Sequence, residues 1–436
     1  MDIKSIEKIV SLSKRRGFIF QSSEIYGGLA STWDYGPLGV EMKNNIKNLW
    51  WQDIVTSRRN IVGMDAAILM HPEVWEASGH VQNFNDPMVD CKNCKARYRA
   101  DHIDLSKPCE RCGKTDWTEP RQFNLMFKTS FGALAESGDI TYLRPETAQG
   151  IFVNFNNVVT TARQKLPFGI AQLGKAFRNE ITTGNFLFRT REFEQMELEY
   201  FIKPEEAENE LKYWSQERLN WYKKLGVRAN KLRLRPHDKD ELAHYSKACY
   251  DIEYEFPFGW SELEGIADRG TYDLDQHNKH ANKKQSYFDQ ENNKHIVPAV
   301  IEASGGVDRT FLTCLVDAYH EEEVHGEQRV VLKLSPKIAP ITCAVYPLVN
   351  KDGLPEISDK IFIEIQTEFS AFFDQGGSIG RRYRRQDEAG TPYGITIDHQ
   401  TLEDNTVTLR DRDTMKQIRI PADKVLDELK NRLQNI

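Results

Sequence analysis

The chain has 436 residues and a formal net charge of -7 at pH 7, with 28% of its residues charged and 39% hydrophobic. This composition excludes a largely disordered chain and predicts two or three domains with sizeable cores. The net charge gives no sign of nucleic-acid binding, although a local basic patch would be enough for it. The first residues contain no long apolar run, so we expect a cytoplasmic protein without a signal peptide or membrane span.

The first well-marked element is a helix over residues 36–58. Apolar residues recur there at helical spacing after Pro37, a residue favoured near helix starts. Trp50 and Trp51 fall on adjacent faces, which indicates burial on more than one side. A strand over Met64–Leu69 is expected to follow.

Cysteine spacing marks the next segment. Four of the seven cysteines form two Cys-x-x-Cys pairs: Cys91 with Cys94, and Cys109 with Cys112. Two such pairs separated by a strand-length linker are typical of a zinc ribbon, because four thiolates satisfy tetrahedral Zn²⁺. Four protein ligands leave no open position, so we predict structural Zn²⁺ in an insertion at residues 87–118. The alternative is four free or disulfide-linked cysteines, although the overall cysteine pattern fits a reducing compartment.

A carboxylate stands at a predicted helix start in YLRPETAQG, residues 142–150. Glu146 follows a Pro and precedes the helix, where the positive end of the helix dipole favours a negative charge. Capping is the plain explanation for Glu146, and substrate binding is the other.

Residues 168–201 predict two strands joined by the loop Ile181–Thr190. Because side chains alternate along a strand, one face of the first strand holds Gln172, Gly174, Ala176, Arg178 and Glu180. In the second strand Met196, Leu198 and Tyr200 form an apolar face, and the opposite face holds Phe193, Gln195, Glu197 and Glu199. Phe193 could stack on a base, and Arg178 and Arg191 could grip phosphate. The alternative is an amphipathic hairpin with a solvated, charged face.

Three further segments follow. A helix is predicted over Pro204–Leu225, within a mixed insertion at about 203–258. Residues 297–319 predict a strand, a Gly-Gly turn and a helix. Glu302 and Ser304 share one face of this strand, and Arg309 lies in the first helical turn, where backbone N–H groups attract anions. The alternative is a glycine-rich turn with a solvent-exposed arginine.

A linker at 333–340 precedes a small α/β domain. Its predicted strands are Thr342–Tyr346, Gly394–Asp398 and Thr406–Arg410, and its predicted helices are 358–374 and 421–434. We therefore expect one domain over 1–332 and another over 338–436. A basic run with one aromatic residue lies within 380–398, and a solvated surface turn is the plain explanation for it.

The pattern Arg-x-Glu at 178–180, a loop, and Arg-x-Phe-x-x-x-Glu at 191–197 resembles motif 2 of the class II aminoacyl-tRNA synthetases. RNE, REFEQME and the stretch HPEVWEASGHVQNF at 71–84 are most similar to the glycyl-tRNA synthetases of the single-chain, homodimeric type. The resemblance extends from the first helix to the last. Met64–Leu69 departs from it, because motif 1 usually has a Pro in this strand.

This resemblance implies an α+β fold: an antiparallel sheet flanked by helices, a zinc-ribbon insertion and a C-terminal α/β anticodon-binding domain. It also implies a homodimer and a two-step reaction. Glycine attacks the α-phosphate of ATP to give glycyl-adenylate and pyrophosphate, and the 3′ end of tRNA(Gly) then takes the glycyl group. ATP with Mg²⁺ is required, and no side-chain nucleophile is needed.

The resemblance also implies site residues. Catalytic charge stabilisation is assigned to Arg178, Arg191 and Arg309. ATP binding is assigned to Arg178, Asn179, Glu180, Phe188, Arg191, Phe193, Glu262, Leu263, Gly306 and Arg309. Glycine binding is assigned to Arg99, Glu146, Phe193, Gln195, Glu197, Glu302 and Ser304.

Contacts to tRNA are expected from the basic run after the linker: Arg381, Arg382, Tyr383, Arg384 and Arg385. Clustered cations contact consecutive phosphates, and an aromatic ring stacks on an unpaired base. An alternative function is a non-catalytic nucleic-acid-binding accessory protein on the same fold, but the three ATP-gripping arginines argue against it. Another alternative is the same reaction with a different amino acid.

Overall fold

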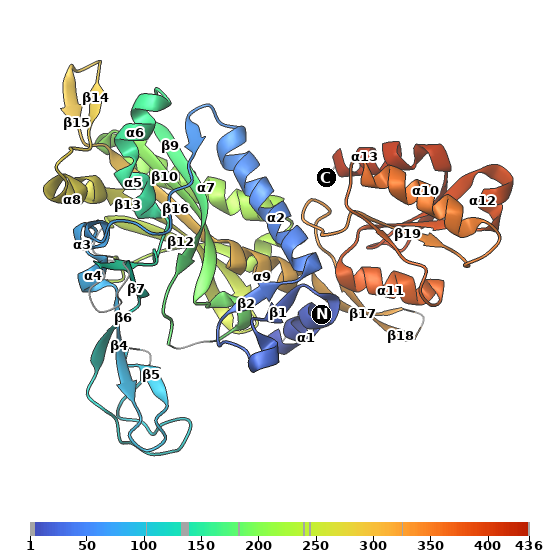
Figure 1. The fold of residues 1–436 in the computed structure, drawn as a ribbon, viewed down its shortest axis with the longest axis horizontal. Helices are drawn as coiled ribbons and strands as arrows, with labels where there is room; N and C mark the ends of the chain where they lie inside the picture. The colour runs from blue at the N-terminus through green and yellow to red at the C-terminus, as the bar shows by residue number, and fades with distance from the viewer. Residues whose placement is uncertain are drawn as a thin grey trace.

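The computed structural model describes residues 5–101, 103–131, 139–181, 184–238, 240–243, 246–324 and 326–434. A seven-stranded sheet forms the centre of the larger domain (Figure 1). Its order is β11 (Leu232–Pro236), β12 (Ala248–Phe256), β13 (Gly259–Gly270), β16 (Ala299–Gly306), β10 (Glu192–Ile202), β9 (Phe168–Phe177) and β3 (Ile61–Gly63). Neighbouring strands are antiparallel except β3 and β9, which are parallel. The predicted α+β class with an antiparallel sheet is confirmed.

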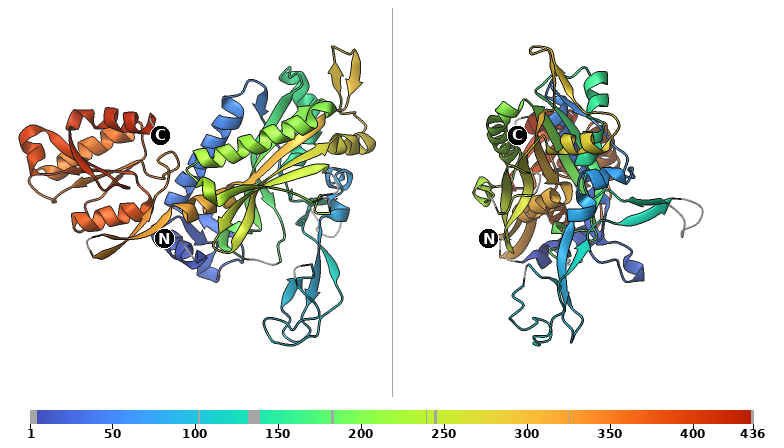
Figure 2. Two further views of the ribbon diagram at one scale, coloured as in Figure 1. Left: turned by 180° about the vertical axis from the view of Figure 1, so that it is seen from behind. Right: turned by 90° about the vertical axis from the view of Figure 1, so that its left-hand side faces the viewer.

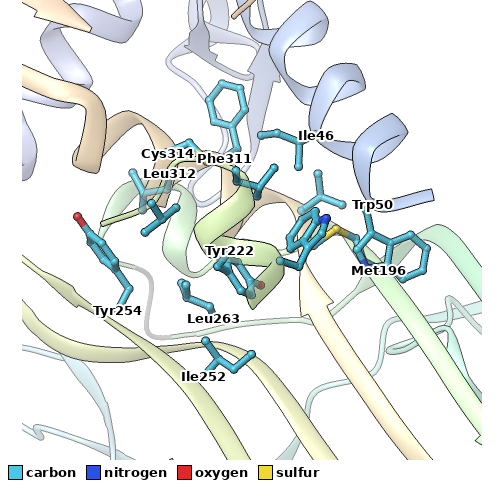
Figure 3. Packing of buried hydrophobic residues seen from close by; sticks show 14 of the residues in the cluster. Ile46, Trp50, Met196, Tyr222, Ile252, Tyr254, Leu263, Phe311, Leu312 and Cys314 are labelled. Carbon is cyan, nitrogen blue, oxygen red and sulfur yellow. The ribbon is translucent and has the colours of Figure 1, made fainter. Parts of the chain in front are cut away.

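Helices cover one face of this sheet. They are α2 (Pro37–Trp51), which continues into a π-helical turn at Gln52–Thr56, α7 (Ala207–Lys224) and α9 (Val307–Ala318). The main hydrophobic core lies between them and the sheet, and Figure 3 shows Trp50, Met196 and Phe311 packing there. The expected apolar face of β10 is confirmed, because Met196, Leu198 and Tyr200 all belong to this core. The opposite face of β10 therefore points away from the helices.

The other face of the sheet is covered at one end by α5 (Ala148–Val153), α6 (Phe155–Thr161) and α8 (Tyr272–His280). Phe168 of β9 and Phe201 of β10 pack there against Phe152 and Phe155. Further along the same face the side chains become polar. That part of the sheet forms the floor of the cavity described below.

Three details of the larger domain differ from the sequence predictions. The strand predicted at Met64–Leu69 is wrong: the edge strand is Ile61–Gly63, and only an isolated bridge forms at Leu69. The segment 203–258, predicted as an insertion, supplies α7 to the main core and β11 and β12 to the sheet. Strand β9 ends at Phe177, so Arg178 and Glu180 lie beyond it.

Smaller elements surround the sheet. They are α1 (Ile6–Arg16), β1 (Ile19–Gln21), β2 (Trp33–Tyr35), α3 (Glu73–Ala77), α4 (His80–Asn83), β7 (Lys128–Phe131), β8 (Asp139–Tyr142), β14 (Tyr287–Asp289), β15 (Lys294–Ile296), β17 (Tyr319–Val324) and β18 (Glu327–Leu332). A three-stranded sheet of β4 (Asn85–Asp90), β5 (Arg97–Arg99) and β6 (Arg121–Asn124) extends from the body, and the cysteine pairs lie in this extension (Figures 1 and 2). Within the described part of the chain, no helix has the length and apolar character needed to cross a bilayer.

The C-terminal domain lies to one side of the larger domain (Figure 2). Its five-stranded sheet has the order β20 (Ala371–Phe373), β19 (Cys343–Pro347), β21 (Tyr393–Ile397), β22 (Thr406–Asp411) and β23 (Gln417–Pro421). Its helices are α10 (Leu354–Gln366), α11 (Ile379–Ala389), α12 (His399–Asp404) and α13 (Val425–Gln434). The helix predicted at 358–374 is wrong in its second half, which forms β20. The basic run lies on helix α11 rather than in a surface turn.

Buried arginines join the two domains. Arg329 on β18 has no exposed surface and donates to Asp387 of α11 at 2.8 Å. Arg412 donates to the carbonyl of Leu334 in the linker, also at 2.8 Å. Each buried charge is therefore satisfied across the domain boundary.

Candidate active site

A cavity of about 320 Å³ lies over the polar face of the sheet. Strand register brings its floor together: Ser304 of β16 pairs with Glu197 of β10, and Glu302 pairs with Glu199. Because side chains alternate, these residues and the polar residues of β9 point to the same face. The predicted residues found in the cavity wall are Glu146, Arg178, Glu180, Phe188, Phe193, Gln195, Glu197, Glu262, Leu263, Glu302, Ser304, Gly306 and Arg309.

One end of the cavity is a cluster of buried carboxyl groups. Oxygen atoms of Glu197, Glu199 and Glu302 lie within 4.8 Å of one another. Burial raises the pKa of Glu197 and of Glu199 well above the ordinary value, and the neighbouring Glu302 raises each further. Burial also raises the pKa of Glu302, against the opposing effect of Arg269. Like charges this close favour retention of a proton, so the cluster attracts a cationic group.

Glu146 is a fourth carboxylate at this end, and it differs from the other three. Burial opposes its ionisation, but the His80 imidazole at 3.3 Å and Arg269 outweigh burial and hold the pKa of Glu146 well below its ordinary value. Gln149 also donates to Glu146, at 3.2 Å. Glu146 therefore stays ionised at neutral pH.

Hydrogen bonds fix the carboxyl groups in place. The hydroxyl of Thr147 donates to Glu197 at 2.7 Å, and the amide of Gln195 donates to the Ser304 hydroxyl at 3.1 Å. Arg269, which is 2% exposed, donates to Glu302 and to Asp273. Both carboxyl oxygens of Glu199 and one of Glu197 have no hydrogen-bond partner among the described residues. The unpaired acceptor of Glu197 lines the cavity and suits a ligand that brings N–H donors, whereas Glu199 is not among the cavity-lining residues.

Arginines form the other end of the cavity. Arg309, in the first turn of α9, lies 3.2 Å from a carboxylate oxygen of Glu262 and 4.5 Å from the ring centroid of Phe188. Burial opposes ionisation of Glu262, but Arg309 prevails and lowers the pKa of that carboxylate. Arg178 lies 5.2 Å from the ring centroids of both Phe84 and Phe193. Two guanidinium groups beside aromatic rings suit a ligand with an anionic group and a flat ring.

Two family models match the chain: a tRNA synthetase class II core domain (G, H, P, S and T) over residues 127–319, and an anticodon binding domain over residues 342–432. A glycine–tRNA ligase of Treponema denticola is 54% identical over 441 residues, which cover 99% of this chain and 98% of that protein. The chain belongs to the glycine–tRNA ligase family. Glycine–tRNA ligases of Borrelia hermsii (54% identical, 99% and 98% covered) and Caldanaerobacter subterraneus (53% identical, 99% of each covered) are similarly close.

Three residues assigned from the family resemblance lie outside the cavity wall. Arg191 donates from Nε to the backbone carbonyl of Glu180 at 3.0 Å and from Nη1 to that of Ala30 at 3.2 Å. Asn179 donates its backbone N–H to the carbonyl of Leu125. Arg99 lies on β5 and is paired with Asp86 and Asp101, at 3.0 and 2.7 Å. These three residues are not among those that line the cavity, and their contacts with the substrates of a glycine–tRNA ligase stay predictions.

Several residues of the site were missed by sequence reasoning. Arg189 lines the cavity 3.7 Å from Glu180, where Arg191 had been expected. Arg269 and His80 hold the carboxylates, but neither residue was itself assigned a role, although both lie in segments that resemble the family. Glu199 could have been predicted as part of the site, because it shares the alternating polar face of the strand with Glu197, but no role was assigned to it. Residues 182–183 of the predicted loop lie outside the described residues.

The cysteine cluster fits a tetrahedral metal. The four sulfur ligands lie within 4.8 Å of one another, and all four cysteines are free of disulfides. Sγ of Cys91 is 3.5 Å from that of Cys112, and Sγ of Cys94 is 3.7 Å from that of Cys109. A tetrahedron with Zn–S bonds near 2.3 Å has edges of about 3.8 Å. The geometry is therefore compatible with Zn²⁺, as predicted.

The basic run of α11 is only partly available to a nucleic acid. Arg382 is 3% exposed and donates to the carbonyls of Gly377 and Pro347. The hydroxyl of Tyr383 bonds Thr396 at 2.6 Å, and its ring packs against Tyr346. These internal contacts argue against the predicted binding of tRNA by Arg382 and Tyr383, which stays a prediction.

The other arginines of this run divide between internal pairing and exposure. Arg385 is paired with Asp374 at 2.7 Å, and Arg384 lies 4.0 Å from Asp387. Arg381 is exposed. The predicted cluster of four cations therefore keeps the exposed Arg381 and the partly exposed Arg384 and Arg385, whose side chains are 33% and 34% exposed.

Proposed function

We propose that this chain attaches glycine to tRNA in two steps, through a glycyl-adenylate formed in the cavity over β10 and β16. The supporting observation is the polarity of that cavity: buried carboxyl groups lie at one end and arginines at the other. Carboxylates suit an amino-acid ammonium, and arginines suit the phosphates of ATP. A non-catalytic role is not favoured, because Arg178 and Arg309 both line the cavity.

Glycine binds through its ammonium group to Glu146, Glu197 and Glu302. Three N–H donors match three carboxylates, and glycine offers no side chain for recognition. Specificity then comes from the absence of space beyond the α-carbon. There Thr147 is hydrogen-bonded to Glu197, and Gln195 is hydrogen-bonded to Ser304. A larger amino acid would clash with these residues or break these hydrogen bonds. Such a clash discriminates between amino acids more strongly than the loss of one methylene contact, which is worth about 1–3 kcal/mol.

ATP binds with its phosphates at Arg178 and Arg309 and its adenine beside Phe193. Arg189 takes the phosphate contact that the sequence had assigned to Arg191. The carboxylate of Glu262, now 3.2 Å from Arg309, would be the ligand for a Mg²⁺ ion bound with ATP, and such an ion would neutralise phosphate charge. The chain's own contribution is positioning and charge stabilisation, since the glycine carboxylate itself attacks the α-phosphate.

The four-cysteine cluster holds one structural Zn²⁺, supported by its sulfur spacing. Arg99 projects from the neighbouring β5, and Glu180 of the cavity wall contributes to its raised pKa, after Asp101 and Asp86. Movement of the ribbon toward the cavity would bring Arg99 to the substrates. This keeps the proposed glycine role of Arg99 open to test by mutation.

The C-terminal domain binds tRNA through the exposed side of α11, with Arg381 and Arg384 as phosphate contacts. We place the boundary between residues 332 and 338, which lies between the two matched family models. The chain acts in the cytoplasm as a homodimer. Ile25 and Tyr26, which are 89% and 87% exposed, offer an apolar surface that a second copy would cover.

The test is pyrophosphate exchange, measured with each amino acid in turn. Glycine should stimulate exchange more than alanine or serine, and Glu302→Gln should reduce it at least about tenfold by removing a charge-assisted hydrogen bond. Glu291→Gln, an exposed substitution, is the matched control. Stimulation by alanine above glycine, or normal exchange in a folded Glu302→Gln protein, would refute the proposal.

A further inference from the structure

Three metal-ligating side chains lie in the cavity wall and have no task in the proposed reaction. His237 follows β11, and Cys249 and Asp251 belong to β12. One ligand atom from each lies within 4.8 Å of the other two. All three side chains line the cavity.

Strand geometry explains why these side chains meet. Alternation along β12 places Cys249 and Asp251 on the cavity face, while Ile252 and Tyr254 enter the core below. The backbone N–H of His237 donates to the carbonyl of Cys249 at 3.0 Å, which holds the imidazole beside β12. The cluster is therefore fixed by the main sheet.

The neighbouring strand leaves room above the cluster. On β13, Ala267 pairs with Cys249, and Gly265 pairs with Asp251. A β-carbon added at Gly265 would lie 3.9 Å from a carboxylate oxygen of Asp251, which is an ordinary van der Waals distance. Gly265 therefore places no side chain beside this ligand atom. The ligand atoms face the cavity across two small residues.

The present contacts leave the thiol unexplained. His237 Nε2 lies 2.7 Å from Asp251 Oδ2, and Arg235 donates to the same oxygen at 3.2 Å. An ion pair of this kind needs no cysteine. Among the described residues, the Cys249 thiol has one hydrogen-bond contact, a weak one to the Tyr250 carbonyl at 3.9 Å. A nitrogen, a sulfur and an oxygen ligand together are typical of zinc sites.

We propose that His237, Cys249 and Asp251 form a second Zn²⁺ site, separate from the four-cysteine cluster, with its remaining coordination position open to the cavity. A thiolate and a carboxylate balance the charge of Zn²⁺, whereas Mg²⁺ prefers oxygen ligands alone. Three protein ligands leave one position of a tetrahedron for water or a small anion. The inference rests on the cavity wall and does not depend on which amino acid is activated.

The experiment uses the full chain, stripped of metal and reloaded with Zn²⁺ or Co²⁺ in the presence of excess Mg²⁺. The wild-type chain should bind about one ion more than Cys249→Ser and about one more than Asp251→Asn. His295→Gln, an exposed histidine on the β14–β15 hairpin, should keep the wild-type content. Thermal unfolding of each variant verifies that it is folded.

Cobalt spectroscopy tests the open position. The difference spectrum between wild type and Cys249→Ser should show one thiolate-to-cobalt band, and thiocyanate should shift it because an open position accepts a small anion. Equal metal content in wild type and both folded variants would overturn the proposal, as would a band that thiocyanate leaves unchanged. Loss of metal from the four-cysteine cluster would lower the metal content of the wild type and of every variant equally. It can therefore be distinguished from loss of metal at the second site, which would lower the content of the Cys249 and Asp251 variants alone.

Discussion

Glu199 gives the sharpest test of the carboxyl cluster. It has no exposed surface, both its oxygens lack hydrogen-bond partners among the described residues, and it does not line the cavity. Two unit charges 4.8 Å apart repel by about 3.5 kcal/mol at an effective dielectric constant near 20. Burial first and Glu302 second raise the pKa of Glu199, so it keeps its proton in the folded chain. Glu199→Gln should therefore stabilise the protein.

The sign and the pH window follow from proton linkage. The unfolded chain releases this proton above the ordinary glutamate pKa of about 4.3, while the folded chain retains it. Stability of the wild type therefore falls as pH rises from that value, and a glutamine at position 199 removes the loss. The expected gain is about 1 kcal/mol at pH 5, and it grows with pH until the folded chain also releases this proton.

Urea unfolding at pH 5, 6, 7 and 8 measures this gain. All eight tryptophans precede residue 261, so their fluorescence follows the larger domain alone. The exposed Glu205→Gln is the matched control and should leave the pH dependence unchanged. If Glu199→Gln were less stable than wild type, or gained the same amount at every pH, the assignment of a retained proton would be refuted.

Three further predictions concern other parts of the molecule. Arg309→Lys should lower ATP-dependent pyrophosphate exchange by about 10–100-fold, because a single ammonium cannot reproduce a bidentate phosphate contact; an unchanged rate would place the phosphates elsewhere. Cys94→Ser should abolish binding of the structural Zn²⁺ and lower the melting temperature. Metal analysis measures the first effect and calorimetry the second, and wild-type values of zinc content and melting temperature would contradict the prediction. Arg382→Ala should destabilise the C-terminal domain, because the hydrogen bonds of Arg382 to two backbone carbonyls are lost. Arg381→Ala should leave stability unchanged and raise the KM for tRNA. If the two substitutions changed stability and KM equally, the assignment of Arg382 to the interior and Arg381 to the tRNA-binding surface would be contradicted.

Local patterns predicted the centre of the site well. Alternation along a strand depends only on backbone geometry, so the faces of Met196 and Glu197 could be read from the sequence. The helix start at Arg309 and the cysteine pairs are equally local signals. Each of these features has the predicted side-chain direction or clustering in the structure.

Contacts set by long-range packing were not predictable in this way. Arg191 and Arg189 are two residues apart, and only the positions of the Glu180 and Ala30 carbonyls decide which one faces the cavity. Arg269 meets Glu302 because β13 pairs with β16. No short stretch of sequence records such pairings, since they depend on elements that come together only in the folded chain.

The basic run on α11 shows how a local pattern can mislead. Four arginines around one tyrosine suggest a surface, because arginine is seldom buried without a partner. A helical period of 3.6 residues nevertheless carries Arg382, Gln386 and Ala389 to one face, and all three are buried. Backbone carbonyls satisfy Arg382, and Asp387 satisfies Arg329 from the other domain. The charge in this segment therefore serves mainly to hold the C-terminal domain together and to join it to the larger one, and only its outer edge is free for a nucleic acid.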